Sequence, residues 1–265
     1  MSTATSADGT TIAYERTGSG PAVVLVDGAL SYRAAGPSGP LARELATDFT
    51  VYTYDRRGRC ESGDTTPYAV QREVEDLAAV LEAAGGSPYV YGISSGAALA
   101  LEAANRGVPM AGLAAYEAPF VVDATRPPVP ADFLEQLRAL LASGRRGDVV
   151  KLFMTQGVRV PAPFVALMQL MPAWSKLKGV AHTVPYDVEI MADGQRGRPL
   201  PADRWPDVKT PTLVIGGSKS PAWLANAARN VADVVPGAEH RVLAGQTHLV
   251  KPKALAPVLR DFFSR

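Results

Sequence analysis

Residues 87–104 read SPYVYGISSGAALALEAA, and this stretch decides the fold. An apolar run typical of a buried strand ends at Gly92, and a helix of small residues follows at once. Residues 92–96 (GISSG) match the pattern G-x-S-x-G, a sharp turn between a strand and a helix that exposes one serine. The sequence therefore predicts that Ser94 stands at the end of a strand, in the position of a nucleophile.

Composition and charge narrow the class of protein. The chain has 265 residues, of which 47% are hydrophobic and 20% charged, as in a globular protein with one large domain. The formal net charge is +1 without a basic or acidic block, so we expect no nucleic-acid or membrane partner. Three scattered histidines do not indicate a metal site, and we expect no cofactor. The pattern does not indicate an oligomeric state.

The expected location of the protein follows from its single cysteine and its first residues. Cys60 cannot form an intrachain disulfide, which favours a reducing compartment. Residues 1–11 are polar and lack the apolar core of a signal peptide, and no stretch approaches the ~20 apolar residues of a membrane span. We therefore expect a cytoplasmic protein.

Strand-like and helix-like runs alternate on both sides of residues 87–104. This rhythm predicts an α/β fold, with a mostly parallel sheet and helices on both faces. The strand-like runs cover 10–17, 22–26, 49–55, 89–94, 111–117, 210–217 and 240–245, and the helix-like runs cover 41–46, 70–86, 95–107, 221–235 and 253–265.

The alternation stops at Pro119. From there to about residue 207 the chain has helical patterns and prolines, at 130–146, 148–157 and 162–180, without a strand-like run. We therefore expect a core made of residues 1–118 and 208–265, with a helical insertion over 119–207.

A serine nucleophile needs a base, and His248 is the candidate. It follows the last strand-like run, so a parallel sheet places it at the edge where Ser94 stands. His240 begins that strand and is expected at the opposite edge. His182 lies in the insertion, where it contacts substrate or caps a helix.

An oxyanion hole is the third requirement, and it is usually built from backbone amides. The amide of Ser95, directly after the nucleophile, is one candidate. The second is the amide of Ala29, in the loop after residues 22–26, where Gly28 allows a tight turn.

Three features together resemble the α/β-hydrolase family: the turn at residues 92–96, called the elbow below, the loop that contains Gly28, and His248 near the end of the chain. Residues 54–62 (YDRRGRCES) are similar to that family's D-x-R-G-x-G-x-S turn, with Cys60 in place of a glycine. The resemblance covers roughly residues 8–118 and 208–264. It implies an α/β-hydrolase fold, a chain order of nucleophile, acid and histidine, and a helical cap (lid) over the active site at 119–207.

The acid of the triad departs from the family pattern. The loop where the acid commonly stands, residues 217–221 (GSKSP), has no carboxylate, and Ser220 occupies the expected position. Some members carry the acid after the preceding strand, where this chain has Glu117. We therefore predict a triad of Ser94, His248 and Glu117. The alternatives for the acid are Asp123 and Asp187, in which case Glu117 caps the insertion or pairs with an arginine.

A second departure concerns the oxyanion loop, which usually reads His-Gly and here reads Asp27-Gly28. An aspartate at this place opposes a developing negative charge unless it bonds to the loop amides, which we favour, or is protonated, or faces away. If the chemistry is acyl transfer or lyase chemistry, Asp27 acts on the substrate.

The insertion is rich in methionine and aromatic residues, which fill irregular apolar space. We expect an apolar roof over a medium-sized substrate, although most of these residues serve the core of the insertion itself. The candidates for pocket contacts are Asp27, Trp174, His182 and Tyr186.

The leading functional prediction is a serine hydrolase that cleaves an ester or a related acyl bond of a small molecule through an acyl-enzyme. The same triad also serves acyl transfer to an alcohol and C–C hydrolase or lyase chemistry. A third hypothesis is a non-catalytic ligand-binding protein on this fold.

Overall fold

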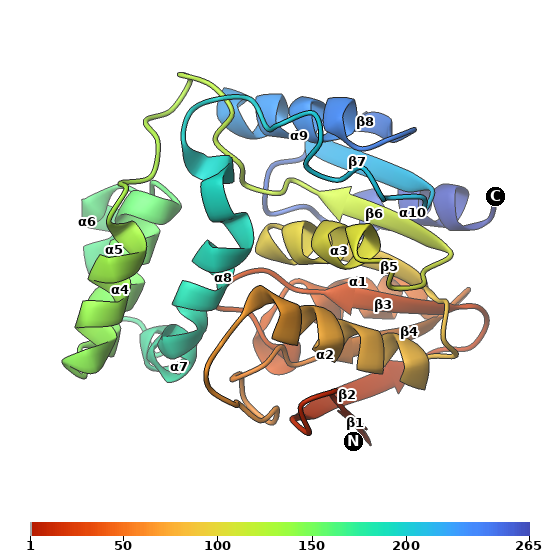
Figure 1. Cartoon of the computed structure of the whole chain (residues 1–265), viewed down its shortest axis with the longest axis horizontal. Helices are drawn as coiled ribbons and strands as arrows, with labels where there is room; N and C mark the ends of the chain where they lie inside the picture. Colours follow the sequence, from red (N-terminus) through yellow and green to blue (C-terminus); the bar gives the residue numbers. More distant parts are fainter. Residues whose placement is uncertain (1) are drawn as a thin grey trace.

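The computed structural model describes residues 2–265, except the side chain of Ala192, and its centre is an eight-stranded sheet (Figure 1). The strand order is β1-β2-β4-β3-β5-β6-β7-β8. β1 pairs antiparallel with β2 and β2 with β4, whereas all further neighbours run parallel. The strands are β1 (Ser2–Thr5), β2 (Thr11–Thr17), β3 (Ala22–Val26), β4 (Thr50–Tyr54), β5 (Tyr89–Ile93), β6 (Gly112–Tyr116), β7 (Thr212–Gly217) and β8 (Glu239–Leu243).

Helices cover both faces of this sheet. The central strands β6 and β7 are buried along their whole length, as expected of parallel strands that are apolar on both sides. One face packs against α2, α3 and α9, and the other against α1 and α10. These helices are α1 (Ser38–Leu45), α2 (Val70–Ala83), α3 (Ser95–Asn105), α9 (Ala222–Val234) and α10 (Pro252–Phe263), with the 3₁₀ turn η1 (Arg33–Ala35) before α1.

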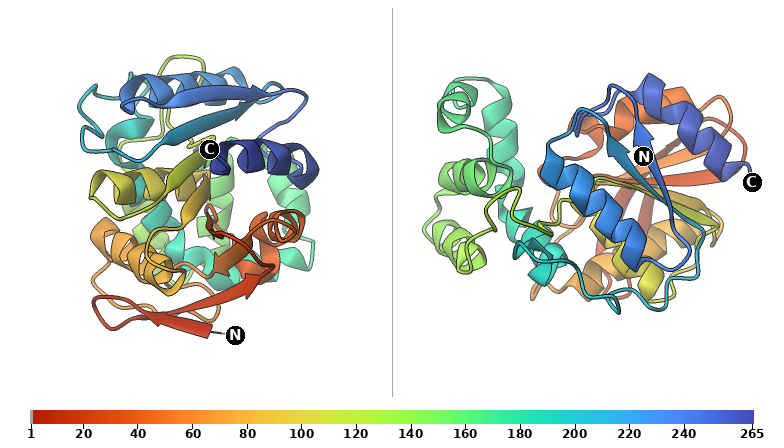
Figure 2. Two further views of the ribbon diagram at one scale, coloured as in Figure 1. Left: turned by 90° about the vertical axis from the view of Figure 1, so that its right-hand side faces the viewer. Right: turned by 90° about the horizontal axis from the view of Figure 1, so that it is seen from above.

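The chain between β6 and β7 forms a helical layer beyond the carboxyl ends of the parallel strands (Figure 2). This layer has an apolar core of its own, which includes Phe133, Leu137 and Trp174. None of the described helices is both long and apolar enough to cross a bilayer. The layer consists of α4 (Phe133–Ala142), α5 (Arg146–Leu152), the π-helical turn η2 (Phe153–Gly157), α6 (Ala162–Met168), α7 (Ala173–Val180), η3 (Ala181–Thr183), α8 (Val184–Met191) and η4 (Ala192–Gln195).

The observed secondary structure differs from the sequence prediction mainly at the edge of the sheet and at the ends of helices. β1 was not predicted, because three of its four residues are polar and exposed at the edge of the sheet. The helix predicted over 130–146 is shorter. It ends at Ala142, and Gly144 with a φ of +71° turns the chain into α5.

Candidate active site

The turn around Ser94 brings the start of helix α3 directly against the end of β3. Ser94 has a φ of 58° and a ψ of −130°, a strained backbone for a residue other than glycine, and its amide donates to the carbonyl of Tyr116 at 2.9 Å. A Cβ at Gly96 would lie 2.3 Å from the carbonyl oxygen of Val26. Glycine is therefore required there for α3 to begin directly against β3.

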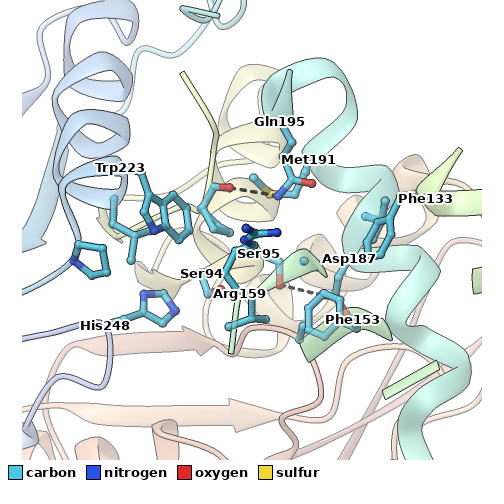
Figure 3. Close-up of a pocket in the computed structure, with 17 residues that line it drawn as sticks. Ser94, Ser95, Phe133, Phe153, Arg159, Asp187, Met191, Gln195, Trp223 and His248 are labelled. Atoms are coloured by element: carbon cyan, nitrogen blue, oxygen red, sulfur yellow. Dashed lines mark hydrogen bonds between the residues drawn. The ribbon is translucent and has the colours of Figure 1, made fainter. Parts of the chain in front are cut away.

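His248 and Glu117 are joined by a direct contact. His248 Nδ1 lies 2.9 Å from Glu117 Oε2, and Glu117 Oε1 accepts a hydrogen bond from the amide of Gly217 at 2.7 Å. Glu117 follows β6, is fully buried and has a φ of 43°. The structure thus brings two residues 131 positions apart together at the strand ends, and His248 lines the same cavity as Ser94 (Figure 3).

The other candidates for the acid have different partners. Asp123 accepts hydrogen bonds from Thr125 and Asn226, and Asp187 is bonded to arginines of the core. Ser220 carries a buried hydroxyl that has no hydrogen-bond partner among the described residues. Glu117 is therefore the carboxylate that the described chain places on His248.

The cavity has a volume of about 260 Å³ and lies between the strand ends and the helical layer. Its wall is mostly apolar and aromatic, with a few polar side chains at fixed places. Arg159, between η2 and α6, is the one arginine or lysine on this wall in the described chain. The lining residues are Ala29, Ser94, Ser95, Pro119, Phe133, Phe153, Gly157, Val158, Arg159, Asp187, Val188, Met191, Gln195, Pro221, Trp223, Leu224 and His248.

Both predicted oxyanion residues, Ala29 and Ser95, line this cavity. The loop that carries Ala29 packs directly on Ser94, because a Cβ at Gly28 would lie 2.8 Å from the Cβ of Ser94. The next residue, Leu30, has a φ of 60°, so the loop turns sharply beside Ser94. Ala29 and Ser95 thus stand at the cavity together with Ser94.

Asp27 does not line the cavity. It is 4% exposed, and its Oδ1 accepts a hydrogen bond from the hydroxyl of Ser38 at 2.6 Å. Burial raises the pKa of Asp27 to about 6, against the opposing effect of Ser38. The carboxylate therefore faces the start of α1, and the alternative in which it contacts substrate is wrong for this geometry.

The three pocket candidates from the insertion also do not line the cavity, contrary to the sequence prediction. Trp174 is buried in the core of the helical layer. Tyr186 stacks on Tyr68 with ring centroids 3.8 Å apart and donates to Asp64, and His182 Nε2 lies 3.9 Å from the same carboxylate. The amphipathic pattern does not show which face of a short helix is turned toward the cavity, and these three residues face elsewhere.

Several cavity residues were not predicted. Trp223 belongs to α9 of the core, and Gln195 and Arg159 stand in short turns of the helical layer. Nothing in the local sequence distinguishes these positions from ordinary surface residues. Their place on the wall depends on how the helical layer sits on the strand ends.

The comparisons with known proteins agree with the fold. Residues 17–258 match the Alpha/beta hydrolase family, so the chain belongs to this family and is a hydrolase. An alpha/beta hydrolase from Sphaerobacter thermophilus is 54% identical with a TM-score of 0.91, over 99% of this chain and all of that one.

More distant structures share the fold. An esterase from Thermogutta terrifontis, solved with malate bound, is 22% identical with a TM-score of 0.69, over 99% of this chain and 97% of that chain. An enol-lactonase from Burkholderia xenovorans is 19% identical with a TM-score of 0.70, over the full length of both chains.

Among curated proteins, "Uncharacterized hydrolase YraK" of Bacillus subtilis is 37% identical over 98 residues. The match covers 36% of this chain and 35% of that protein, so the chain spans about a third of the length of this curated relative.

Proposed function

We propose that the protein is a serine hydrolase that cleaves an ester or a related acyl bond of a medium-sized, largely apolar small molecule through an acyl-enzyme. The observation that carries this proposal is the contact between His248 and the buried Glu117, at the cavity that Ser94 also lines. A nucleophile, a base and a group that orients the base are the parts that such chemistry needs.

In the proposed reaction, His248 Nε2 takes the proton of Ser94 Oγ as the oxygen attacks the acyl carbon. The amides of Ala29 and Ser95 stabilise the oxyanion that forms. Collapse of this intermediate breaks the bond to the leaving alcohol, which receives the proton from His248. Water, deprotonated by His248, then attacks the acyl carbon, the bond to Ser94 Oγ breaks, and His248 returns the proton to Ser94 Oγ as the acid leaves. Glu117 holds Nδ1–H and stabilises the imidazolium in both steps.

The cavity also suggests the kind of substrate. Its apolar wall and volume of about 260 Å³ suit a small molecule with an apolar body. Arg159 has no ion pair among the residues that the structure describes. Burial and then Arg159 lower the pKa of the nearby Arg126 to about 10, as expected of two cations without an acid between them. We therefore expect that an acidic group on the substrate increases its affinity.

A fluorophosphonate probe tests the proposed nucleophile. We expect covalent labelling of the wild-type protein, loss of labelling in Ser94→Ala, and full labelling in the control Ser175→Ala, which removes an exposed hydroxyl from α7. Labelling that persists in Ser94→Ala contradicts the mechanism, and a protein that is never labelled favours a ligand-binding role. Product analysis with competing alcohols distinguishes hydrolysis from acyl transfer.

A further inference from the structure

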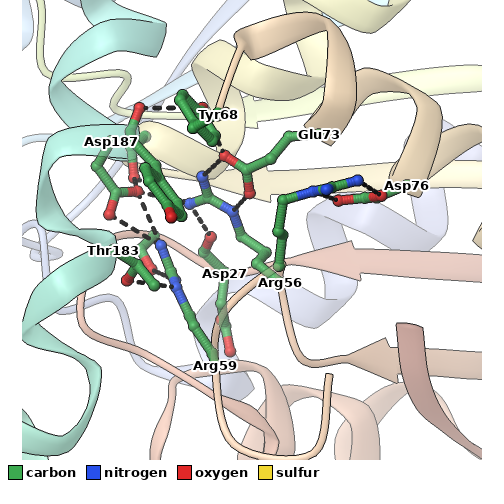
Figure 4. A network of polar contacts seen from close by, with 12 residues as sticks. Asp27, Arg56, Arg59, Tyr68, Glu73, Asp76, Thr183 and Asp187 are labelled. Atoms are coloured by element: carbon green, nitrogen blue, oxygen red, sulfur yellow. Dashed lines mark hydrogen bonds and ion pairs between the residues drawn. The ribbon is translucent and has the colours of Figure 1, made fainter. Parts of the chain in front are cut away.

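A buried charge cluster joins the helical layer to the core (Figure 4). Asp187, in α8, is 2% exposed. Arg59 Nη2 donates to both of its carboxylate oxygens at 3.0 and 2.8 Å, and Arg56 Nη1 donates to Oδ1 at 2.6 Å. Both arginines come from the turn at residues 55–62. Paired buried charges thus hold Asp187 of the helical layer to the core turn at residues 55–62. Breaking such a pair lowers the stability of the fold.

The same carboxylate reaches the elbow. The hydroxyl of Ser95 donates to Asp187 Oδ1 at 2.7 Å, and both residues line the cavity. Ser95 is the first residue of α3, and its amide is one of the two proposed oxyanion donors. Asp187 therefore fixes the side chain of the residue whose amide is a proposed oxyanion donor.

The second oxyanion donor is linked to Asp187 through Arg59. Arg59 Nη1 donates to the carbonyl oxygen of Gly28 at 2.6 Å and to that of Ser31 at 3.0 Å. The peptide bond between Gly28 and Ala29 is trans, so its C=O and N–H point in opposite directions. Because Arg59 holds the carbonyl, the amide of Ala29 points away from Arg59.

Charge compensation lets a carboxylate occupy this place. Burial acts to raise the pKa of Asp187, but Arg59 and Arg56 outweigh it and hold the pKa below its usual value. Arg56 is in turn bonded to Glu73 at 2.8 and 2.7 Å. The negative charge of Asp187 is therefore neutralised locally and does not oppose a developing oxyanion.

We propose that Asp187 and Arg59 are positioning residues that hold both oxyanion amides, those of Ser95 and Ala29, in their working orientation when the helical layer is docked on the core. This inference rests on the proposed function. Within the described part of the chain, Asp187 is the one residue of the helical layer that is bonded both to the Ser95 hydroxyl and to Arg59, which holds the Gly28–Ala29 peptide.

The test compares Asp187→Asn with Asp76→Asn. Asp76 is also buried and pairs with Arg57 of the same turn through two hydrogen bonds, at 2.8 and 2.7 Å, but it contacts neither oxyanion segment. We expect both variants to lower the melting temperature. Only Asp187→Asn should lower kcat, by roughly ten- to a hundredfold with little change in KM, since a misplaced donor costs less than a deleted one.

A trifluoromethyl ketone forms a tetrahedral adduct with Ser94 and reports directly on the oxyanion hole. Its affinity should fall in Asp187→Asn by the same factor as kcat/KM, and should be unchanged in Asp76→Asn. If folded Asp187→Asn keeps wild-type kcat and ketone affinity, or if Asp76→Asn loses as much, the inference is wrong. Arg59→Lys and Ser95→Ala replace Asp187→Asn if that variant does not fold, with the same expected losses.

Hydrogen–deuterium exchange gives a readout that does not need a substrate. Asp187→Asn should increase exchange in peptides that cover residues 27–31 and 94–96, and Asp76→Asn should not. Unchanged exchange in these peptides overturns the inference. A wild-type protein that hydrolyses no ester and is not labelled by the fluorophosphonate contradicts the proposed function instead, and the exchange result still decides the positioning role.

Discussion

Two buried carboxylates near the cavity, those of Glu117 and Asp187, have very different surroundings. Glu117 is bonded to one backbone amide and to His248, and no arginine contacts it among the described residues. Asp187 is bonded to two arginines and a serine hydroxyl. The comparison shows two different uses of a buried negative charge. A carboxylate without a permanent cation can stabilise an imidazolium that forms transiently, whereas a neutralised one holds structure in place.

The strongest test of this comparison is Glu117→Gln. The amide side chain can still accept the hydrogen bond from Gly217, but it does not carry the charge that stabilises the imidazolium. We expect kcat to fall by about a thousand- to ten-thousandfold while the protein stays folded. Steady-state kinetics alongside circular dichroism measure this. If Asp187→Asn costs more activity than Glu117→Gln, the roles of the two carboxylates are reversed.

Asp27 extends the comparison to a buried carboxylate with no direct ion pair among the described residues. Its pKa is raised from 3.8 to about 6, so the stability that its protonated form contributes below pH 4 is lost as pH rises through 6. At about 1.4 kcal/mol per pH unit, this corresponds to at most about 3 kcal/mol.

We therefore expect Asp27→Asn to be more stable than wild type at pH 8 and to gain nothing at pH 4. Urea unfolding at several pH values between these limits measures the difference. A wild-type protein whose stability rises between pH 4 and pH 6 relative to Asp27→Asn would show that the carboxylate is ionised and well paired in the folded state.

A substitution at Ser220 tests whether the carboxylate that serves His248 can stand at a second position. Its hydroxyl is buried beside Gly217, the residue that donates to Glu117, and the family resemblance places a carboxylate at this position. We expect Ser220→Asp to restore activity to Glu117→Gln by about tenfold or more, because it returns a negative charge near His248. Ser220→Asn in the same background is the control. Equal activity of the two double variants contradicts this expectation.

Arg159 is the charged group of the cavity that no acid compensates within the described chain. We expect Arg159→Gln to lower kcat/KM about tenfold for a mono-para-nitrophenyl ester of glutaric acid, which carries a carboxylate, and to leave para-nitrophenyl valerate unaffected, since one exposed charge contact contributes modestly. Arg198→Gln, an exposed arginine away from the cavity, is the control. An equal loss for both esters would assign Arg159 to packing rather than to charge recognition.

Much of the fold could be predicted, because its signals are local. The bounds of the seven predicted strands lie within two residues of those of β2 to β8. The turn at Ser94 was predicted from Gly92 and Gly96, and neither position has room for a Cβ. The contact between His248 and Glu117 was also predicted, because parallel strands bring the residues that follow them to one edge.

By itself, the sequence determined the parallel sheet, the serine at the turn between β5 and α3, and the residues that follow the strand ends, since strand periodicity and turn chemistry act over a few neighbouring residues. Only the tertiary structure decided that Trp174, His182 and Tyr186 turn away from the cavity while Arg159 and Trp223 line it. It also decided that Arg59 and Asp187, 128 positions apart, form an ion pair. The physical reason is that the orientation of a short helix depends on the surface it packs against, which no local pattern contains.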